Sequence, residues 1–214
     1  MNTLNQIIDF LILFVFFALS ISVHECAHAY SAYRLGDPTA KNQGRVTLNP
    51  LKHLDPLGTL LIFLIKFGWA KPTPINATYF KDRKKGTMIT SLAGPMSNLL
   101  LAIILAFPVA YFNNNATTEL NEFLFKVFLI GFDLNVTLAI FNLIPISPLD
   151  GSKILSGFLP SKVYYKFIEY EYYIMIAFVI LVLTGILGRV LWPIVGIVEK
   201  AIISLVSPII GLIF

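Results

Sequence analysis

The sequence contains few of the groups that soluble and secreted proteins rely on. Only 13% of its 214 residues are charged, whereas soluble domains carry about 25%. Cys26 is its only cysteine, so no disulfide can form within the chain. The net charge of +4 is small, and basic residues 81–85 lie beside an apolar segment, which indicates membrane topology rather than nucleic-acid binding. These scarcities argue against a soluble domain, a disulfide framework and a nucleic-acid partner.

The N-terminus also lacks the basic region and the small-residue cleavage site of a signal peptide, so we expect the first apolar run to be retained. Apolar residues are abundant, at 57% of the chain, and the mean hydropathy is +0.77. We therefore expect an integral multi-pass membrane protein that has the lipid bilayer as its surroundings. Residues 1–214 should form one domain, with a core at about 6–160 and further apolar segments at about 170–214.

Long apolar runs set the expected fold. A membrane-spanning helix needs about 20 mostly apolar residues. Spans are predicted at 6–34, 86–112, 122–143 and 172–187, and a shorter, re-entrant or tilted segment at 56–67. The tail at 190–214 is apolar but interrupted, so it either spans the membrane or lies in the interface. The sequence thus predicts an all-α polytopic membrane protein, a helical bundle of about four to six membrane segments.

Two extended stretches interrupt the helical pattern. Residues 44–50 and 68–76 have turn residues and prolines around short β-like runs. Strand edges are not tolerated in lipid, so we expect these stretches to form a short re-entrant β-hairpin after the first helix. A spare edge near Val46 could pair with an extended peptide. An ordinary interfacial hairpin is the alternative.

The distribution of basic residues predicts the orientation. The stretch from Arg34 to Lys85 holds ten lysines and arginines, whereas residues 113–121 hold none. The positive-inside rule then places the N-terminus outside and the loop after the first helix inside. The end of the first helix should therefore lie in the cytoplasmic half of the membrane.

That end carries the pattern His24-Glu25-Cys26-Ala27-His28. Positions four apart on a helix are separated by about 400°, so His24 and His28 share a face one turn apart. Two neutral imidazoles placed in this way can hold one zinc ion, and a glutamate between them can act on water as a catalytic base. The pattern predicts one zinc ion per chain, with Glu25 as the base.

Zinc in a catalytic site needs a third protein ligand. Asp150 is the best candidate, because it follows a predicted span, returns to the cytoplasmic side and lies in a backbone fixed by prolines and a glycine. An ordinary turn aspartate or helix N-cap is the alternative for Asp150. Zn²⁺ with ionised Asp150 and Glu25 would carry no net charge, which lowers the free-energy cost of burying the two carboxylates.

The remaining histidine lies just before a predicted helix start. His53 therefore fits a loop-ordering role in a second shell, with direct ligation as the alternative. Asp55 and Pro56 follow it, and they are suited to the N-cap and the first position of a helix.

Small and polar residues recur at helical spacing on two predicted spans. They are suited to close helix packing and to hydrogen bonds across the gap. Asn98 and Asn142 lie toward the expected site, so one of them is a candidate for binding the substrate backbone or a developing oxyanion. The stripes consist of Thr87, Ser91, Gly94, Asn98 and Ala102, and of Gly131, Asn135, Ala139 and Asn142.

The order of these motifs resembles the site-2 protease family of intramembrane zinc metalloproteases, and within it the compact prokaryotic branch that lacks a PDZ domain. The resemblance covers about residues 20–160. It implies His24, His28 and Asp150 as zinc ligands, Glu25 as the base, and residues 39–49 as the family's re-entrant β-loop. Many members have asparagine where this chain has Ser147. The motifs are HExxH, Asn49-Pro50-Leu51, Asp55-Pro56-Leu57-Gly58, Gly68-Trp69-Ala70-Lys71-Pro72, Ala93-Gly94-Pro95, Phe141-Asn142-Leu143-Ile144-Pro145 and Pro148-Leu149-Asp150-Gly151.

The expected function is hydrolysis of peptide bonds within or near transmembrane segments of membrane protein substrates, in a prokaryotic cell membrane. The alternative is a membrane metal-binding or metal-transport protein without proteolytic activity. A transporter would place further polar ligands along its spans. The sequence has few acids and histidines to form such a second cluster.

Overall fold

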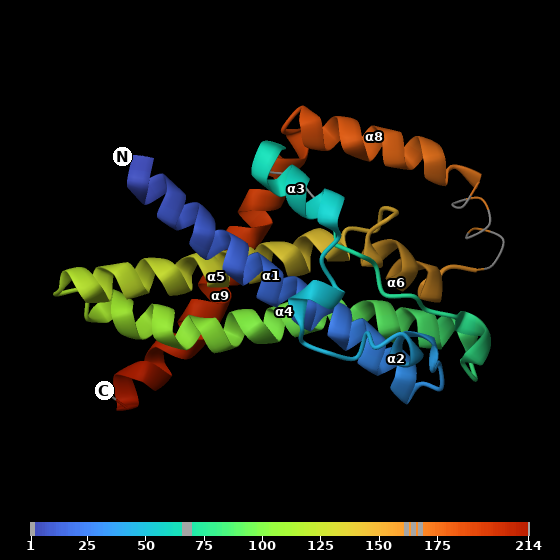
Figure 1. Cartoon of the computed structure of the whole chain (residues 1–214), viewed down its shortest axis with the longest axis horizontal. Helices are drawn as coiled ribbons and strands as arrows, with labels where there is room; N and C mark the ends of the chain where they lie inside the picture. Colours follow the sequence, from blue (N-terminus) through green and yellow to red (C-terminus); the bar gives the residue numbers. More distant parts are fainter. Residues whose placement is uncertain (1–2, 66–69, 161–162, 164–165, 167–168, 214) are drawn as a thin grey trace.

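The computed structural model describes residues 3–65, 70–160, 163, 166 and 169–213. Within these ranges it is a helical protein whose long helices run through the body, while shorter ones gather at one side (Figure 1). The helices are α1 (Thr3–Arg34), α2 (Thr39–Asn42), α3 (Pro56–Ile65), α4 (Arg83–Asn114), α5 (Glu119–Leu143), α6 (Asp150–Phe158), α8 (Glu171–Leu183) and α9 (Ile186–Ile213), with 3-10 turns at Pro50–Lys52 and Ala77–Tyr79.

Helices α4 and α5 form an antiparallel hairpin that is the centre of the fold (Figure 1). Polar side chains set its boundaries, because free backbone N–H groups at a helix start need acceptors. Asp82 accepts from the amide of Lys85 at the start of α4, and Thr118 accepts from the amide of Asn121 at the start of α5. The short turn between them keeps the two helices in contact along their length.

The hydrophobic core lies where α9 packs on this hairpin. Alanines on α4 leave room for larger side chains of α5 and α9, so the three helices approach closely. The core is therefore built by residues far apart in the chain. Its buried members are Ala102, Ala106, Val109 and Ala110 of α4, Phe132 and Val136 of α5, and Leu191, Val195, Ile202, Val206 and Ile210 of α9.

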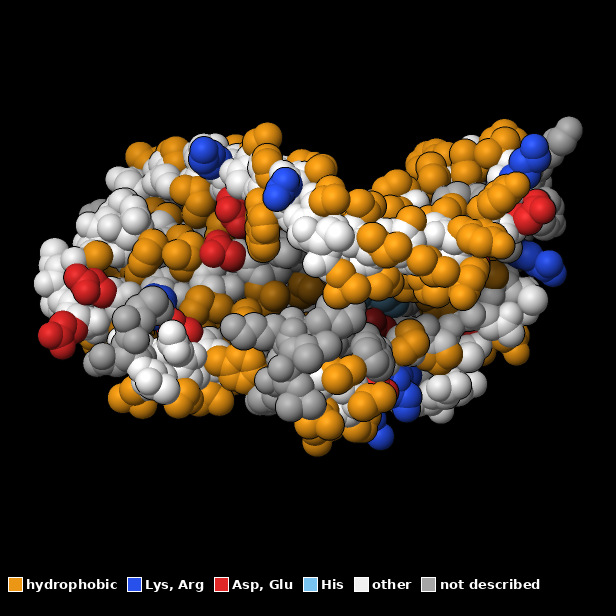
Figure 2. All heavy atoms as spheres, turned by 90° about the horizontal axis from the view of Figure 1, so that it is seen from above, with side chains coloured by type: hydrophobic (Ala, Val, Ile, Leu, Met, Phe, Trp, Pro, Cys, Tyr) orange, Lys and Arg blue, Asp and Glu red, His pale blue; other side chains and the backbone are white. Residues whose placement is uncertain are grey.

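Four helices, α1, α4, α5 and α9, are long and apolar enough to cross a membrane. Figure 2 shows hydrophobic side chains over much of one face, with charged side chains at its two ends and also between them. The predicted helical, multi-span architecture is confirmed.

The predicted fourth span at 172–187 is wrong. Helix α8 has only 13 residues, or about 20 Å at 1.5 Å per residue, which is short of the hydrocarbon core of about 30 Å. It ends before Gly185, which adopts φ +71°, a conformation that stops a helix. The fourth candidate span is the tail, which forms the continuous helix α9 despite Pro193 and Pro208.

The predicted β-hairpin after the first helix is not supported. Among the described residues there is no strand, only an isolated antiparallel bridge between Leu54 and Ala70. Residues 39–42, expected within a β-loop, are helical. Pro72 and Pro74 lack the N–H groups that a second strand would need. Gly68 and Trp69, expected in the second strand, lie outside the described residues.

The predicted start of the short apolar helix is confirmed. Helix α3 begins at Pro56, and the Asp55 carboxylate accepts from the amide of Gly58 at 2.8 Å. A carboxylate at this position satisfies a free N–H group and interacts favourably with the helix dipole. Residues 66 and 67, predicted as the end of this segment, lie outside the described residues.

Helix α1 crosses the hairpin at Gly131 of α5. The close contact there predicts that adding one methyl group at this position destabilises the protein. A Cβ at Gly131 would lie 2.4 Å from the ring of Phe16. We expect Gly131→Ala to destabilise the protein by about 1–3 kcal/mol through overpacking and to lower the thermal unfolding midpoint in detergent.

Two further variants test this explanation. Gly196→Ala is the matched control, because nothing lies within 4 Å of its added Cβ and alanine favours a helix over glycine. Adding Phe16→Leu to Gly131→Ala should recover part of the lost stability. Equal unfolding midpoints for Gly131→Ala and Gly196→Ala would contradict the packing account.

Candidate active site

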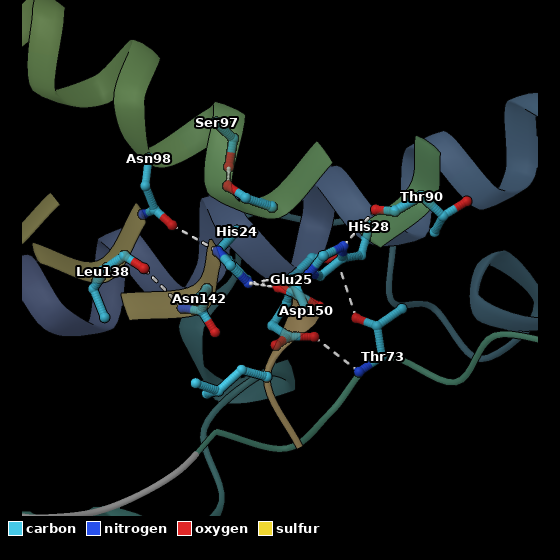
Figure 3. Close-up of polar contacts among 12 residues, drawn as sticks. His24, Glu25, His28, Thr73, Thr90, Ser97, Asn98, Leu138, Asn142 and Asp150 are labelled. Atoms are coloured by element: carbon cyan, nitrogen blue, oxygen red, sulfur yellow. Dashed lines mark hydrogen bonds and ion pairs between the residues drawn. The ribbon is translucent and has the colours of Figure 1, made fainter. Parts of the chain in front are cut away.

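Three side chains from two distant helices converge inside the protein. His24 and His28 lie one turn apart on α1, and Asp150 begins α6 (Figure 3). All three are buried. Asp150 Oδ2 lies 3.1 Å from Nε2 of His24 and 3.1 Å from Nε2 of His28, and the two Nε2 atoms are 3.0 Å apart. The structure therefore brings the three predicted metal ligands together.

The hydrogen bonds on the far side of each imidazole fix its tautomer. His28 Nδ1 lies 2.7 Å from the carbonyl oxygen of Thr90, and a carbonyl can only accept, so Nδ1 of His28 donates. His24 Nδ1 lies 2.6 Å from Oδ1 of Asn98, which likewise accepts. Each neutral ring then presents a bare Nε2 lone pair to the centre of the group.

The donor set fits a metal ion. Two Nε2 lone pairs and a carboxylate oxygen face one another at about 3 Å, an arrangement of three acceptors that a cation stabilises. Ligand atoms around tetrahedral zinc, bonded at about 2.0–2.2 Å, are separated by roughly 3.3–3.5 Å. Second-shell acceptors on Nδ1 are also typical of metal-binding histidines. His24, His28 and Asp150 could therefore hold zinc.

A glycine on α4 makes room for the group. A Cβ at Gly94 would lie 2.4 Å from Nε2 of His28 and 2.6 Å from Nε2 of His24. The two rings cannot turn away without losing their Nδ1 hydrogen bonds. Gly94 therefore leaves open the space beside the ligand atoms, which is a tighter requirement than the packing role that its small-residue stripe suggested.

Asp150 points into the group rather than toward its own helix. The N-cap position of α6 is Leu149, and no side chain caps it. The neighbouring Gly151 lies against the end of α5, since a Cβ there would be 2.3 Å from the carbonyl oxygen of Ile144. This close approach turns the chain back from α5 and directs the Asp150 carboxylate toward α1.

Asn98 is fully engaged inside the protein. Its amide group donates to Asn135 Oδ1 at 3.0 Å while its oxygen accepts from His24. Asn135 in turn donates to the hydroxyl of Ser20 at 2.8 Å. This network joins α4, α5 and α1, so the contacts of Asn98 are those of a residue that orients His24.

Asn142 lies near the end of α5, and Figure 3 draws it with the group. Its side-chain amide donates to the carbonyl of Leu138 at 2.9 Å. It is half-buried and takes no part in the Asn98 network. Its predicted contact with substrate stays a prediction.

Glu25 lies on the neighbouring face of α1 and is held by residues of two loops. Its Oε2 accepts from the backbone amide of Thr73 at 2.8 Å (Figure 3). The Thr73 hydroxyl donates to the backbone carbonyl of Glu25 at 3.1 Å. The buried guanidinium of Arg45 lies 4.0 Å from the same Oε2.

Thr73 belongs to an extended segment, residues 70–76, which we call the strap. Its backbone is anchored to side chains and loops rather than to a strand: the amide of Lys71 donates to the carbonyl of His53 at 2.7 Å, and that of Asn76 donates to Asp37 at 2.7 Å. Pro72 and Pro74 have no N–H to offer on the opposite edge. These contacts hold the strap over Glu25 and fix Thr73 as the residue that binds its carboxylate.

His53 supports this region and is not among the residues that could hold the metal. It is fully buried, and its Nε2 donates to the carbonyl of Thr47 at 2.8 Å. Val46 is half-buried in a bend beside it. The predicted strand edge at Val46 is absent from the described residues, so a substrate pairing there has no strand to extend.

Sequence reasoning missed four contributors to the site. Thr90 and Thr73 act through backbone atoms, which leave no mark in the residue type. Gly94 was treated as packing. Arg45 follows Gly44 in a polar loop, so its residue type gave no signal that it would be buried beside Glu25. The zero-charge count for zinc, Asp150 and Glu25 omitted this cation.

The burial of His53 predicts a pH dependence of stability. Burial lowers the pKa of its imidazole below the ordinary 6.5, and the hydrogen bond to Thr47 only partly opposes this. Its stabilising contribution is therefore complete above pH 6.5 and is lost as the pH falls toward the lowered pKa, because the unfolded chain binds the proton first.

We expect wild-type protein in detergent with a chelator to lose more stability than His53→Gln between about pH 7.5 and pH 5.5. Glutamine keeps a donor for Thr47 but does not titrate in this range. Parallel unfolding midpoints for the two proteins across this range would contradict the assignment.

The position of Gly94 beside the two Nε2 atoms allows a direct test of metal binding. Gly94→Ala should reduce bound zinc from about one per chain to well below half, because the methyl group would occupy the space beside both Nε2 atoms. The measurement is metal content after dialysis against limiting zinc. Gly211→Ala, where nothing lies within 4 Å of the added Cβ, should bind as wild type. Full zinc content in Gly94→Ala would show that the group does not hold the metal.

Known proteins resemble this chain over most of its length. The sequence model of Peptidase family M50 matches residues 108–183. A Bacillus subtilis protein named "Putative zinc metalloprotease YwhC" is 43% identical over 194 residues, 89% of each chain. The Mycolicibacterium smegmatis protein named "Putative zinc metalloprotease Rip2" is 30% identical over 84% of this chain and 70% of its own.

A more distant relative, "Zinc metalloprotease MJ0392" of Methanocaldococcus jannaschii, is 27% identical over 76% of this chain and 38% of its own. No solved structure matches this chain significantly. The motif, the buried ligand group and the extended identity agree: the chain belongs to Peptidase family M50, the site-2 protease family of zinc metalloproteases.

Proposed function

We propose that this protein is an intramembrane zinc metalloprotease that hydrolyses peptide bonds within or near transmembrane segments of membrane protein substrates. The observation that carries the proposal is the convergence of two bare imidazole Nε2 atoms and one carboxylate inside a bundle of candidate spans. The zinc metalloprotease relatives support the choice of metal and of reaction class. One zinc ion per chain would be held by His24, His28 and Asp150.

The site would lie in the cytoplasmic half of the membrane. The ligand pair stands on α1 between its middle and its C-terminal end, which is followed by the lysine- and arginine-rich stretch 34–85. The positive-inside rule then orients the N-terminus outside. The relatives are bacterial and archaeal, which favours a prokaryotic cell membrane.

Zinc, when bound, would polarise the scissile carbonyl and make water a better proton donor. The rest of the chemistry belongs to the protein. Glu25 would take the proton of the attacking water and pass it to the leaving amine. Thr73, by donating to Oε2 at 2.8 Å, would hold the carboxylate in one orientation. Asn142 remains the candidate for contacting the substrate backbone.

A substrate helix would have to unwind before cleavage, because its backbone amides are otherwise hydrogen-bonded within the helix. A substrate segment could not form a regular β-ladder with the outer edge of the strap, since Pro72 and Pro74 lack the N–H groups that such a ladder needs. We therefore expect substrates with helix-destabilising residues near the cleavage point to be preferred.

The alternative function, membrane metal binding or transport, predicts metal uptake without hydrolysis. Among the described residues the only group of three or more histidine, cysteine or acidic side chains suited to a metal is the one above. A transport path would need further ligands along the spans. This single group favours a resident catalytic metal.

Glu25→Gln separates the two functions. We expect it to abolish cleavage of a transmembrane test peptide while zinc content stays near one per chain, because glutamine cannot accept the proton and is not a ligand. The assay uses purified protein in detergent, with a chelator followed by zinc re-addition as control. Cleavage that persists in Glu25→Gln would exclude Glu25 as the base.

A second outcome concerns the wild type. If wild-type protein binds one zinc ion but shows no chelator-sensitive cleavage of any helix-destabilised peptide, the metal-binding alternative is favoured. Cleavage that stops with chelator and returns with zinc supports the protease.

A further inference from the structure

Arg45 is a buried cation beside the proposed base, with no role assigned so far. Its side chain is 4% exposed. Nη2 donates to the carbonyl of Lys71 in the strap at 2.5 Å and lies 4.0 Å from Oε2 of Glu25. An arginine is almost never fully buried unless it is paired, so this position needs an explanation.

The local sequence places Arg45 there. Gly44 has φ +66° and ends α2, its amide donating to the carbonyl of Lys41, while the amide of Arg45 donates to that of Ala40. This is the Schellman pattern, in which a left-handed glycine follows the helix and the next residue turns inward. The turn sends the Arg45 side chain toward α1 and the strap.

The guanidinium is only partly used by the fold. Its Nε is buried and has no hydrogen-bond partner among the described residues, although an arginine offers five N–H donors. A purely structural arginine would satisfy such a donor, because an unpaired buried donor is destabilising. The spare donor and the retained charge indicate that the cation itself serves the site.

The charges around the group explain what the cation adds. A divalent metal ion, Asp150, Glu25 and Arg45 together carry one net positive charge, whereas without Arg45 they carry none. As Glu25 takes the proton of the attacking water, the negative charge passes from its carboxylate to the substrate carbonyl oxygen, so the total charge of site and substrate does not change. With Arg45 that total is one positive charge throughout instead of zero, and a fixed positive charge in a buried site favours the developing oxyanion.

We propose that Arg45 is a positioning residue of the hydrolytic site, fixing Glu25 and the strap in one arrangement and keeping a positive charge beside the base. This role rests on the proteolytic function proposed above. Arg45 acts through Glu25 and through Lys71 of the strap, not by contact with the metal.

Three variants test it: Arg45→Met, Arg45→Lys, and Lys52→Met as a control on an exposed lysine of the neighbouring turn. The measurements are kcat and KM for a transmembrane test peptide, zinc affinity by competition with a chromophoric chelator, and the unfolding midpoint. We expect Arg45→Met to lower kcat by about 10–100-fold with KM unchanged. Arg45→Lys should recover part of kcat, and Lys52→Met should match wild type.

Zinc affinity distinguishes charge from structural damage. Removing a cation near a divalent metal leaves its affinity equal or higher, whereas a distorted site binds metal more weakly. An unchanged kcat in Arg45→Met overturns the proposal. A fall in kcat that is matched by weaker zinc binding and a lower unfolding midpoint overturns it as well, because Arg45 would then be structural only.

The strap provides an independent variant should Arg45→Met fold poorly. Thr73→Pro removes the N–H that binds Glu25 within an already extended, proline-flanked segment, and Thr73→Val keeps that N–H as the control. If Arg45 and Thr73 act through the same carboxylate, the losses in kcat for Arg45→Lys and Thr73→Pro are not additive. Additive losses overturn the shared role.

Failure of the proposed function would look different. Wild-type protein would then show no chelator-sensitive cleavage at all, while zinc affinity could still be compared between wild type and Arg45→Met. Weaker zinc binding in the variant would overturn the charge role of Arg45 without reference to turnover, and equal or tighter binding would support it.

Discussion

The site depends on two hydrogen bonds that the ligand histidines donate through Nδ1, one to Asn98 and one to the backbone of Thr90. Both acceptors belong to α4. Because they fix each ring as the Nδ1–H tautomer, both Nε2 lone pairs face the Asp150 carboxylate. The close contact of α1 with α4, which Gly94 permits, is thus what directs the two imidazoles to one point where they could bind a metal.

This constraint extends through the helical core. Asn98 can accept from His24 because its amide group donates to Asn135, which in turn donates to Ser20. In a membrane interior, where water does not compete, such a chain of buried partners holds helices in register. The hydrophobic core of α4, α5 and α9 keeps the same hairpin rigid from the other side. A displaced helix would therefore change the tautomers as well as the packing.

The second half of the site is built from loops rather than spans. Glu25 is covered by the strap. The strap is held by the side chains of Arg45 and Asp37 and by the backbone carbonyl of His53, none of which belongs to a strand. Because Pro72 and Pro74 lack N–H groups, the register of the strap depends on these three contacts. The arrangement separates two proposed tasks: α1, α4 and α6 bring the candidate metal ligands together, while the strap and Arg45 would orient Glu25.

The sequence by itself determined the spans α1, α4 and α5, the cap at Asp55 and the pairing of His24 with His28, because these follow from hydropathy and from spacing along one helix. It also singled out Asp150, through resemblance and topology. Only the tertiary structure decided the short α8, the strap in place of a hairpin, and the partners Thr90, Thr73 and Arg45. Those features arise from backbone atoms and side chains that are distant in sequence, and their contacts depend on how the helices pack rather than on any local pattern.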